Sequence, residues 1–223
     1  MVRVERGAGP WGPDAVTMAG EPAGWDVDAA IRVRRLRVGP YDNSAYVVAD
    51  PDSGRAVLID AANEAERLLG ALRGLEVVAV LETHGHADHW QALAAVRRAL
   101  PAVPVLAHAA DLGMFPPPPL TAIADGAVIE VGRLRLTAMH TPGHTPGSLC
   151  FTTPGFLFSG DTLFPGGPGA VRPPLGDFPT IIRSLETRCF PLPDATVVYP
   201  GHGLETTIGA ERPHLREWAD RGW

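Results

Sequence analysis

The sequence predicts an α/β protein in which two β-sheets pack together and helices cover them on the outside. Strand patterns occur in two batches along the 223 residues, and helical patterns follow each batch. VVAVLET at 77–83 is a continuous apolar run that ends abruptly, which is typical of a buried strand whose C-terminal end delivers residues to a site. Two packed sheets with outer helices accommodate this order of elements.

The first batch of strands is predicted from alternating or continuous apolar patterns and from the turn residues between them. Its members are AIRVRRLRV (30–38), AYVVAD (45–50), RAVLID (55–60), VVAVLET (77–83) and VPVLAH (103–108). Helical spacing of apolar residues predicts helices at 64–72 and at 91–100, and Pro101 ends the second of them.

The second batch consists of apolar strands separated by Gly and Pro: AVIEV (127–131), RLRLTAMH (133–140), SLCFTT (148–153), GFLFSG (155–160) and ATVVYP (195–200). A helix is expected at 178–189, where Asp177 is a suitable N-cap, and a closing helix at 211–220. GMFPPPPL at 113–120 cannot stay helical, so we expect it to run extended as a surface loop.

Composition and charge exclude several classes of protein. The net charge of −6 is spread along the chain without a basic stripe, so we expect no nucleic-acid partner. No stretch approaches the ~20 apolar residues of a membrane span, and the N-terminus lacks the apolar run of a signal peptide. We therefore expect a cytoplasmic protein without membrane contact. Cys150 and Cys189 are expected to be free thiols, with one disulfide as the alternative.

The Gly-, Pro- and Ala-rich residues 1–28 are expected to form an irregular N-terminal segment, and residues 29–223 a single domain.

The strongest functional signal is ETHGHADHW at 82–90, which places three histidines and an aspartate within six positions. Neutral imidazoles and a carboxylate are good ligands for Zn²⁺, Fe²⁺ or Mn²⁺. In an extended or turning loop, His84 and His86 can share one ion, while Asp88 and His89 can face a neighbouring ion. Two ions need more ligands than this loop supplies.

Three further positions offer the missing ligands. His144 in TPGHTPGS, Asp161 in FLFSGDTLF and His202 in VVYPGHG each stand beside glycine at the end of a predicted strand, where backbone and metal can approach closely. Three other histidines lack this combined setting and are left out of the site: His108, His140 and His214. For His140 we expect a structural hydrogen bond.

HGHADH, followed in order by TPGHT, SGDTLF and PGHG, resembles the metallo-β-lactamase-fold superfamily, and within it the glyoxalase II-like hydrolases. The resemblance runs from about residue 30 to residue 205. It implies a four-layer αββα sandwich with the site along one edge of the two sheets. It also implies the ligands of two ions: His84, His86 and His144 for the first, Asp88, His89 and His202 for the second, and Asp161 bridging both.

The activity that this resemblance implies is metal-dependent hydrolysis of a thioester or another ester-like small molecule. Two divalent ions, zinc in the first place and iron or manganese as alternatives, would hold a hydroxide that attacks the acyl carbonyl. Asp88 would orient the hydroxide and accept its proton. Arg172, the one cation of segment 164–174, is expected to meet an anionic group of the substrate. Segments 114–120 and 164–174 are expected to move or to shape the substrate site. The oligomeric state stays open.

The chain also departs from the glyoxalase II pattern, so the substrate stays open. It contains no lysine, and it ends soon after His202, where we expect no C-terminal helical domain. The main alternative is a persulfide dioxygenase with one Fe²⁺ on His84, His144 and Asp161, although Ser148 stands where those enzymes often have cysteine. A lactonase, a β-lactamase, a nucleic-acid phosphodiesterase and a non-catalytic metal-binding scaffold are less favoured, the last because all seven ligands are present.

Overall fold

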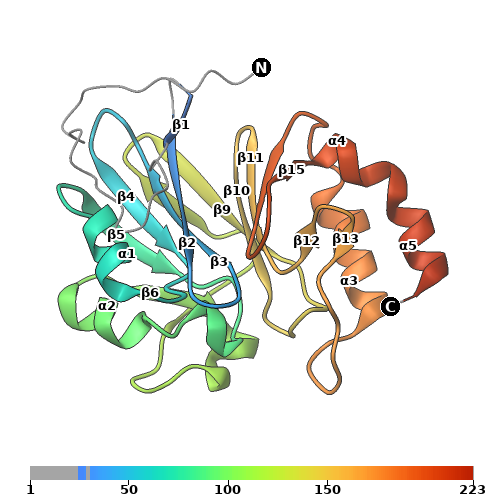
Figure 1. The fold of residues 1–223 in the computed structure, drawn as a ribbon, viewed down its shortest axis with the longest axis horizontal. Helices are drawn as coiled ribbons and strands as arrows, with labels where there is room; N and C mark the ends of the chain where they lie inside the picture. Colours follow the sequence, from blue (N-terminus) through green and yellow to red (C-terminus); the bar gives the residue numbers. More distant parts are fainter. Residues whose placement is uncertain (1–24, 29–30, 223) are drawn as a thin grey trace.

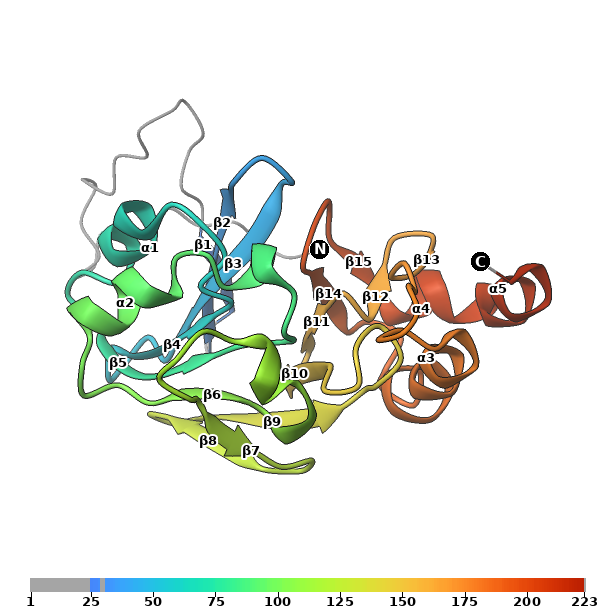
Figure 2. The ribbon, with the colours of Figure 1, turned by 90° about the horizontal axis from the view of Figure 1, so that it is seen from below.

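Two mixed β-sheets lie face to face, and helices cover the outer face of each (Figure 1). The view turned by 90° shows the same four layers (Figure 2). The computed structural model describes residues 25–28 and 31–222. The αββα sandwich expected from the sequence is confirmed. Its outer helices are α1 (Ala65–Ala71) and α2 (Leu93–Ala99) on one side and α3 (Phe178–Ser184), α4 (Ile208–Glu211) and α5 (Leu215–Arg221) on the other.

The first sheet contains seven strands in chain order: β1 (Trp25–Asp28), β2 (Ile31–Val38), β3 (Asn43–Ala49), β4 (Arg55–Ile59), β5 (Glu76–Leu81), β6 (Val105–His108) and β7 (Thr121–Ile123). β1 to β4 pair antiparallel, whereas β4 to β7 run parallel. Parallel neighbours need crossover connections, and α1 and α2 supply two of them. The carboxyl ends of β4, β5 and β6 therefore meet at one edge of the sheet.

The second sheet has the strand order β15-β14-β11-β10-β9-β8. Its strands are β8 (Val128–Val131), β9 (Leu134–His140), β10 (Leu149–Thr153), β11 (Phe156–Gly160), β14 (Val197–Pro200) and β15 (Thr206–Thr207). Only β11 and β14 run parallel, so their carboxyl ends also lie at one edge. Between them in the chain come a small hairpin, β12 (Leu163–Phe164) and β13 (Gly167–Pro168), and the helix α3, which continues as a π-helical turn at Leu185–Cys189.

The central strands of each sheet are buried on both faces, because each sheet is covered by the other sheet and by helices, whereas the outer face of β8 is exposed. In β3, Ala45 and Val47 belong to the apolar cluster beneath α1 and α2, whereas Tyr46 and Val48 belong to the cluster between the sheets. Successive side chains of a strand point to opposite faces, which produces this alternation. Full burial of a large apolar side chain stabilises the fold by about 1.5–3 kcal/mol. Because the strands that lead to the site contain many such side chains, their ends are held firmly in place.

The structure differs from the sequence prediction between β6 and β8. Segment 113–120 was expected to run extended as a surface loop, but its first two residues end the 3₁₀ helix Ala109–Met114. Phe115 and Leu120 are buried in the cluster beneath α1 and α2, whereas Gly113 and the prolines at 117–119 are exposed. β7, which follows directly, was not predicted. Its three residues are too few to show a periodic pattern, and it forms because β6 offers an unpaired parallel edge.

Two other segments also differ from the expectation. Trp25–Asp28 was expected to be irregular, but it pairs with β2 as an antiparallel edge strand, since the backbone of β2 offers that pairing whatever the composition of the segment. The remaining part of the irregular segment lies outside the described residues. Segment 164–174, expected to have little regular structure, contains β13 and part of β12, and its Gly167 is buried.

Several local predictions are confirmed. Asp177 caps α3, with its carboxylate accepting a hydrogen bond from the backbone N–H of Thr180. Cys150 and Cys189 are free thiols and are fully buried in the cluster beneath α3 and α5. In the described part of the chain, no helix combines the length and the apolar character needed to span a membrane.

Candidate metal centre

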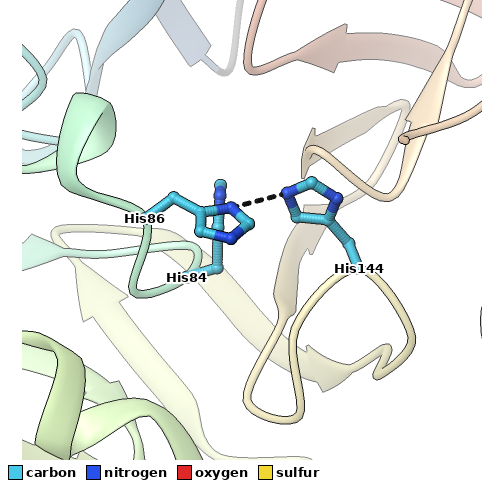
Figure 3. A group of neighbouring side chains, drawn as sticks. All are labelled: His84, His86 and His144. Carbon is cyan, nitrogen blue, oxygen red and sulfur yellow. Dashed lines mark hydrogen bonds between the residues drawn. The ribbon is translucent and has the colours of Figure 1, made fainter. Parts of the chain in front are cut away.

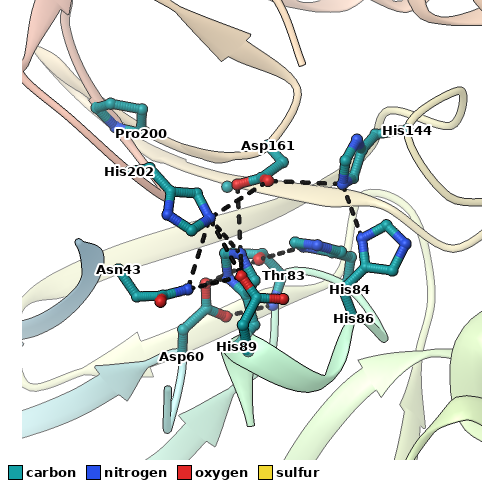
Figure 4. Close-up of polar contacts among 12 residues, drawn as sticks. Asn43, Asp60, Thr83, His84, His86, His89, His144, Asp161, Pro200 and His202 are labelled. Carbon is teal, nitrogen blue, oxygen red and sulfur yellow. Dashed lines mark hydrogen bonds and ion pairs between the residues drawn. The ribbon is translucent and has the colours of Figure 1, made fainter. Parts of the chain in front are cut away.

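Each predicted ligand follows the end of a strand, and the topology brings these ends to one place (Figure 4). Loop 82–90 follows β5, His144 lies in the turn between β9 and β10, Asp161 follows β11 and His202 follows β14. The structure thus brings together side chains from both sheets. They form three overlapping groups whose possible ligand atoms lie within 4.8 Å of one another: His84, His86 and His144; His84, His89 and Asp161; and Asp88, His89 and His202.

The first group consists of three imidazoles that face one another (Figure 3). Nδ1 of His86 lies 2.9 Å from Nε2 of His144. The ring of His84 stands nearly perpendicular to both of the other rings, with centroid distances of 4.8 Å to each. Three nitrogen atoms therefore converge on one point, as the ligands of a single ion do.

The second group, as the term is used from here on, consists of Asp88, His89 and His202, which combine two imidazoles and a carboxylate. Nε2 of His202 lies 3.3 Å from Oδ2 of Asp88 and 3.2 Å from Nε2 of His89. The side chain of Asp88 is 28% exposed, whereas that of His89 has no exposed surface. Asp88 and His202, which is 24% exposed, are thus the members of this group that face solvent.

Asp161 lies between the two groups. Its Oδ1 is 3.4 Å from Nε2 of His89, and its Oδ2 is 3.5 Å from Nε2 of His144 and 3.6 Å from Nε2 of His202. Oδ2 thus lies near a ligand of each group and Oδ1 near His89, so this carboxylate stands where a residue shared by two ions would have to stand, and its bridging role stays a prediction. Its close neighbour in the next strand end is Gly201, where a side chain would collide with it.

The outer nitrogens of two ligands are held by backbone carbonyls. Nδ1 of His144 donates to the carbonyl of Ala170 at 2.8 Å, and Nδ1 of His202 donates to the carbonyl of Tyr41 at 2.8 Å. Because a carbonyl can only accept, Nδ1 of each ring must carry a proton, which leaves Nε2 as the atom of each ring that can bind an ion in the cluster. Metal-binding histidines are oriented by hydrogen bonds of this kind.

His89 is held in the same way by a carboxylate. Its Nδ1 donates to Oδ2 of Asp60 at 2.8 Å. Asp60 follows β4, is buried and also accepts hydrogen bonds from the backbone N–H and the hydroxyl of Thr83. Its φ of 59° lies in the left-handed region, which aspartate tolerates better than most residues. Asp60 therefore orients His89 from behind.

A divalent ion fits this cluster because the cluster leaves polar atoms without partners. Nε2 of His84 and Oδ1 of Asp161 are buried and have no hydrogen-bond partner in the described part of the chain. Buried polar atoms without a partner are rare in folded proteins, and each is costly. Imidazole nitrogens and carboxylate oxygens are suitable donors for zinc, iron or manganese, so bound ions would satisfy both orphaned atoms.

The two groups differ in their electrostatics. Burial, followed by the nearby ring of His89, holds the pKa of His84 well below its ordinary value, and burial also lowers the pKa of His144. For His89, burial opposes protonation, but the carboxylates of Asp161 and Asp60 outweigh it and raise the pKa well above the ordinary value. The first group thus consists of neutral imidazoles, and the second carries compensating positive and negative charges.

Two residues that support the site were not identified from the sequence. Asn43 at the start of β3 donates from Nδ2 to Oδ2 of Asp88 at 2.9 Å, and its backbone pairs with that of His202. Asp60 closes the strand pattern RAVLID, so its position after an apolar run was a signal that could have been used. Asn43 sits among turn residues and gives no such signal.

The histidines left out of the site lie elsewhere in the structure. Nε2 of His140 donates to the carbonyl of Pro146 at 2.9 Å, which is the structural hydrogen bond expected for it, and its ring stacks on that of His108. Arg172 is exposed on the segment between β13 and α3, two residues after Ala170, whose carbonyl holds a ligand.

Known proteins are similar to this chain in sequence and in fold. The family model of the metallo-beta-lactamase superfamily matches residues 38–202. The hydroxyacylglutathione hydrolase GloC of Haemophilus influenzae is 31% identical over 203 residues, which cover 82% of this chain and 95% of that protein.

Three solved structures are similar to this chain over most of its length. The BLEG-1 B3 metallo-beta-lactamase superposes with a TM-score of 0.75 at 31% identity, covering 82% of this chain and 97% of that one. TTHA1623, in a di-iron-bound form, has a TM-score of 0.72 at 35% identity, with 80% and 96% covered. ETHE1 from Myxococcus xanthus has a TM-score of 0.75 at 29% identity, with 84% of each chain covered. The family model spans well over half of the chain, and the chain therefore belongs to the metallo-beta-lactamase superfamily.

Proposed function

We propose that this protein is a metal-dependent hydrolase that cleaves a thioester or a related acyl ester of a small molecule. The observation that carries the proposal is the convergence of seven side chains into two groups joined by Asp161. When bound, two divalent ions lower the pKa of a shared water and polarise the acyl carbonyl. The orphaned nitrogen of His84 supports such ions, and the hydroxyacylglutathione hydrolase among the relatives supports the acyl substrate.

Asp88 is the residue best suited to handle the proton of the attacking water. Its carboxylate is more exposed than that of Asp161, with 28% against 12% of the side chain accessible, so it can exchange protons with solvent. Although burial acts to raise the pKa of Asp88, hydrogen bonding to His202 and the nearby charge of His89 outweigh burial and keep the pKa below its ordinary value. The carboxylate is therefore ionised at neutral pH, which is the state in which a general base acts.

The substrate reaches the cluster from the side of the exposed Asp88. Arg172 is exposed and has no ion-pair partner among the described residues, so it is available for an anionic group of the thiol carrier. A carrier with a carboxylate or phosphate end fits this arrangement. The nature of the carrier is part of the proposal and is tested with alternative thioesters.

The alternative is oxidation of a persulfide with one Fe²⁺ held by His84, His144 and Asp161. It is favoured by the contact of 3.5 Å between His144 and Asp161 and by the similarity to ETHE1. It leaves Asp88 and His202 without a ligand role. The hydrogen bonds from Asn43 to Asp88 and from His202 to Tyr41 hold these side chains in place, which favours the arrangement with two ions.

The deciding experiment combines metal analysis with two activity assays on the purified protein. Two ions per chain, with turnover of an acyl thioester such as a hydroxyacyl-glutathione, support the hydrolase. One iron per chain, with oxygen uptake on a glutathione persulfide and no thioester turnover, supports the alternative. A chromogenic β-lactam serves as the control for the similarity to BLEG-1, and turnover of that compound alone contradicts the acyl-ester proposal.

A further inference from the structure

A buried carboxylate outside the predicted ligands joins the two loops that carry the first group of histidines. Asp111 lies in the 3₁₀ segment Ala109–Met114, directly after β6, and it has no exposed surface. It belongs to none of the three groups of possible ligands. Its carboxylate is therefore free to accept hydrogen bonds from its surroundings instead of holding an ion.

Both oxygens of Asp111 accept hydrogen bonds from the histidine loops. Oδ2 accepts from the backbone N–H of Gly85 at 2.9 Å and from the hydroxyl of Thr145 at 2.6 Å. Oδ1 accepts from the backbone N–H of Gly147 at 2.7 Å. Gly85 separates the two histidines of the first loop, and Thr145 directly follows the histidine of the second. One carboxylate thus touches the immediate neighbour of every imidazole in the first group.

These contacts leave little freedom for the second loop. A Cβ atom on Gly147 would lie 2.5 Å from Cγ of Asp111, so the backbone of the turn is pressed against the carboxylate. Within the turn, the backbone N–H of Thr145 donates to Oγ of Ser148 at 3.0 Å, and the two hydroxyl oxygens are 2.8 Å apart. The turn is fixed in itself, and its position relative to the other loop is set at Asp111.

Asp111 acts across the gap between the two sheets. It follows β6 of the first sheet, whereas the loop of His144 connects β9 and β10 of the second. A backbone hydrogen bond from Leu149 N–H to the Thr83 carbonyl, at 2.8 Å, also links these loops. That bond does not depend on the carboxylate, so the sheets stay together when Asp111 is changed.

The second group of ligands has separate supports. Asp88 is held by Asn43, His89 by Asp60 and His202 by the carbonyl of Tyr41. None of these contacts involves Asp111. A change at Asp111 should therefore be felt at one of the two ion positions only.

We propose that Asp111 is a positioning residue that fixes the distance between the two histidine loops and thereby sets the affinity for the ion bound by His84, His86 and His144. It does not contribute to the affinity for the second ion. The inference rests on the proposed function in requiring divalent ions at the cluster, but it concerns metal affinity and not the reaction.

The experiment is zinc binding to the full-length protein, measured by equilibrium dialysis over a range of buffered free zinc concentrations. For Asp111→Asn, one zinc equivalent should require a 10–100-fold higher free zinc concentration, and the other should bind as in the wild type. Thr145→Val removes one of the hydrogen bonds to the carboxylate and keeps the size of the side chain. It should raise the free zinc concentration needed for the same zinc equivalent by a smaller factor. If Asp111→Asn does not fold, Thr145→Val provides the test of the inference.

The matched control is Asp50→Asn. Asp50 is also a fully buried aspartate that accepts hydrogen bonds from two backbone N–H groups and one hydroxyl. It follows Ala49 at the end of β3, whereas Asn43 at the other end of this strand contacts the site. It should lower the melting temperature and leave both zinc equivalents unchanged. In a His202→Ala background, which lacks a ligand of the second group, Asp111→Asn should weaken the one remaining zinc and Asp50→Asn should not.

Wild-type affinity for both ions in Asp111→Asn and Thr145→Val would overturn the inference. An equal shift of both equivalents, or the same shift in Asp50→Asn, would also overturn it, because the effect would then be general destabilisation. A wild-type protein that binds zinc without hydrolysing thioesters contradicts the proposed function alone. If the wild type binds a single ion, the two-ion arrangement is wrong. The inference then requires Asp111→Asn to lower the affinity for that ion.

Discussion

Gly201 provides the space that the metal cluster needs, and its replacement by alanine is a direct test of the site. A Cβ atom at this position would lie 2.2 Å from Oδ1 of Asp161 and 2.7 Å from Cε1 of His89. The backbone cannot retreat, because the N–H of Gly201 donates to Gly160 at 2.8 Å and its carbonyl accepts from Ser44 at 2.7 Å. The carboxylate of Asp161 must therefore move, by roughly 1 Å, to reach van der Waals contact.

A displacement of this size is large for a metal site, where ligand distances are defined to about 0.2 Å. We expect Gly201→Ala to lose at least one ion at a zinc concentration that saturates the wild type. Because misplacement by about 1 Å can cost 10²-fold in rate, kcat/KM for a thioester should fall by about that factor or more. Metal analysis after dialysis and steady-state kinetics measure the two effects, and circular dichroism confirms the fold.

Gly70→Ala is the matched control, since it is the same change on an exposed face of α1 with no atom within 4 Å of the new Cβ. It should stabilise the protein by about 0.5–1 kcal/mol, seen as a slightly higher melting temperature, and leave metal content unchanged. If Gly201→Ala keeps its full metal content and wild-type kcat/KM, the geometry described for Asp161 is wrong.

Three further substitutions test separate parts of the structure. Asp161→Asn should retain one ion if the site is binuclear and none if it is mononuclear, with turnover lower by orders of magnitude; two ions with normal turnover would remove Asp161 from the ligands. Arg172→Ala should raise KM more than it lowers kcat, and an unchanged KM would exclude it from the substrate site. Burial acts to raise the pKa of Asp50, but hydrogen bonds from the Ser53 hydroxyl and the backbone N–H of Arg133 outweigh burial and lower the pKa from 3.8 to about 2. In the metal-free state, the free energy of unfolding of the wild type should therefore exceed that of Asp50→Asn by about 2 kcal/mol above pH 4. This difference should disappear as the pH falls from about 4 to about 2, and urea denaturation at several pH values measures it. A difference that stays constant over this range would contradict the prediction.

The sequence was sufficient to predict the elements that show a local pattern. VVAVLET followed by HGHADH predicts both a buried strand and a ligand loop, because apolar run and polar ligands are adjacent in the chain. The same reasoning placed Asp161 and His202 after β11 and β14. The parallel pairing of these two strands then brings both residues to the same edge.

The supporting residues could not be predicted because their roles depend on contacts between distant segments. Asp111 and Gly85 are 26 positions apart, and Asn43 and Asp88 are 45 apart. In the sequence, Asp111 is one of many acidic residues and Asn43 is one of several turn residues. Only the three-dimensional arrangement shows that each of them contacts a ligand or the neighbour of a ligand.

The separation of these supports has a consequence for the chemistry of the site. Asp111 and the Ala170 carbonyl support the first group, and Asn43 supports the second. Asp60 holds His89 and also Thr83, whose hydroxyl contacts His84, and Asp161 faces both groups. If two ions bind, we expect substitutions at Asp111 and at Asn43 to act mainly on different ions. We therefore expect the packing behind the seven possible ligands to influence whether one or two ions bind at a given metal concentration. Substitutions at Asn43 and Asp111 should accordingly produce two different one-ion forms of the same protein.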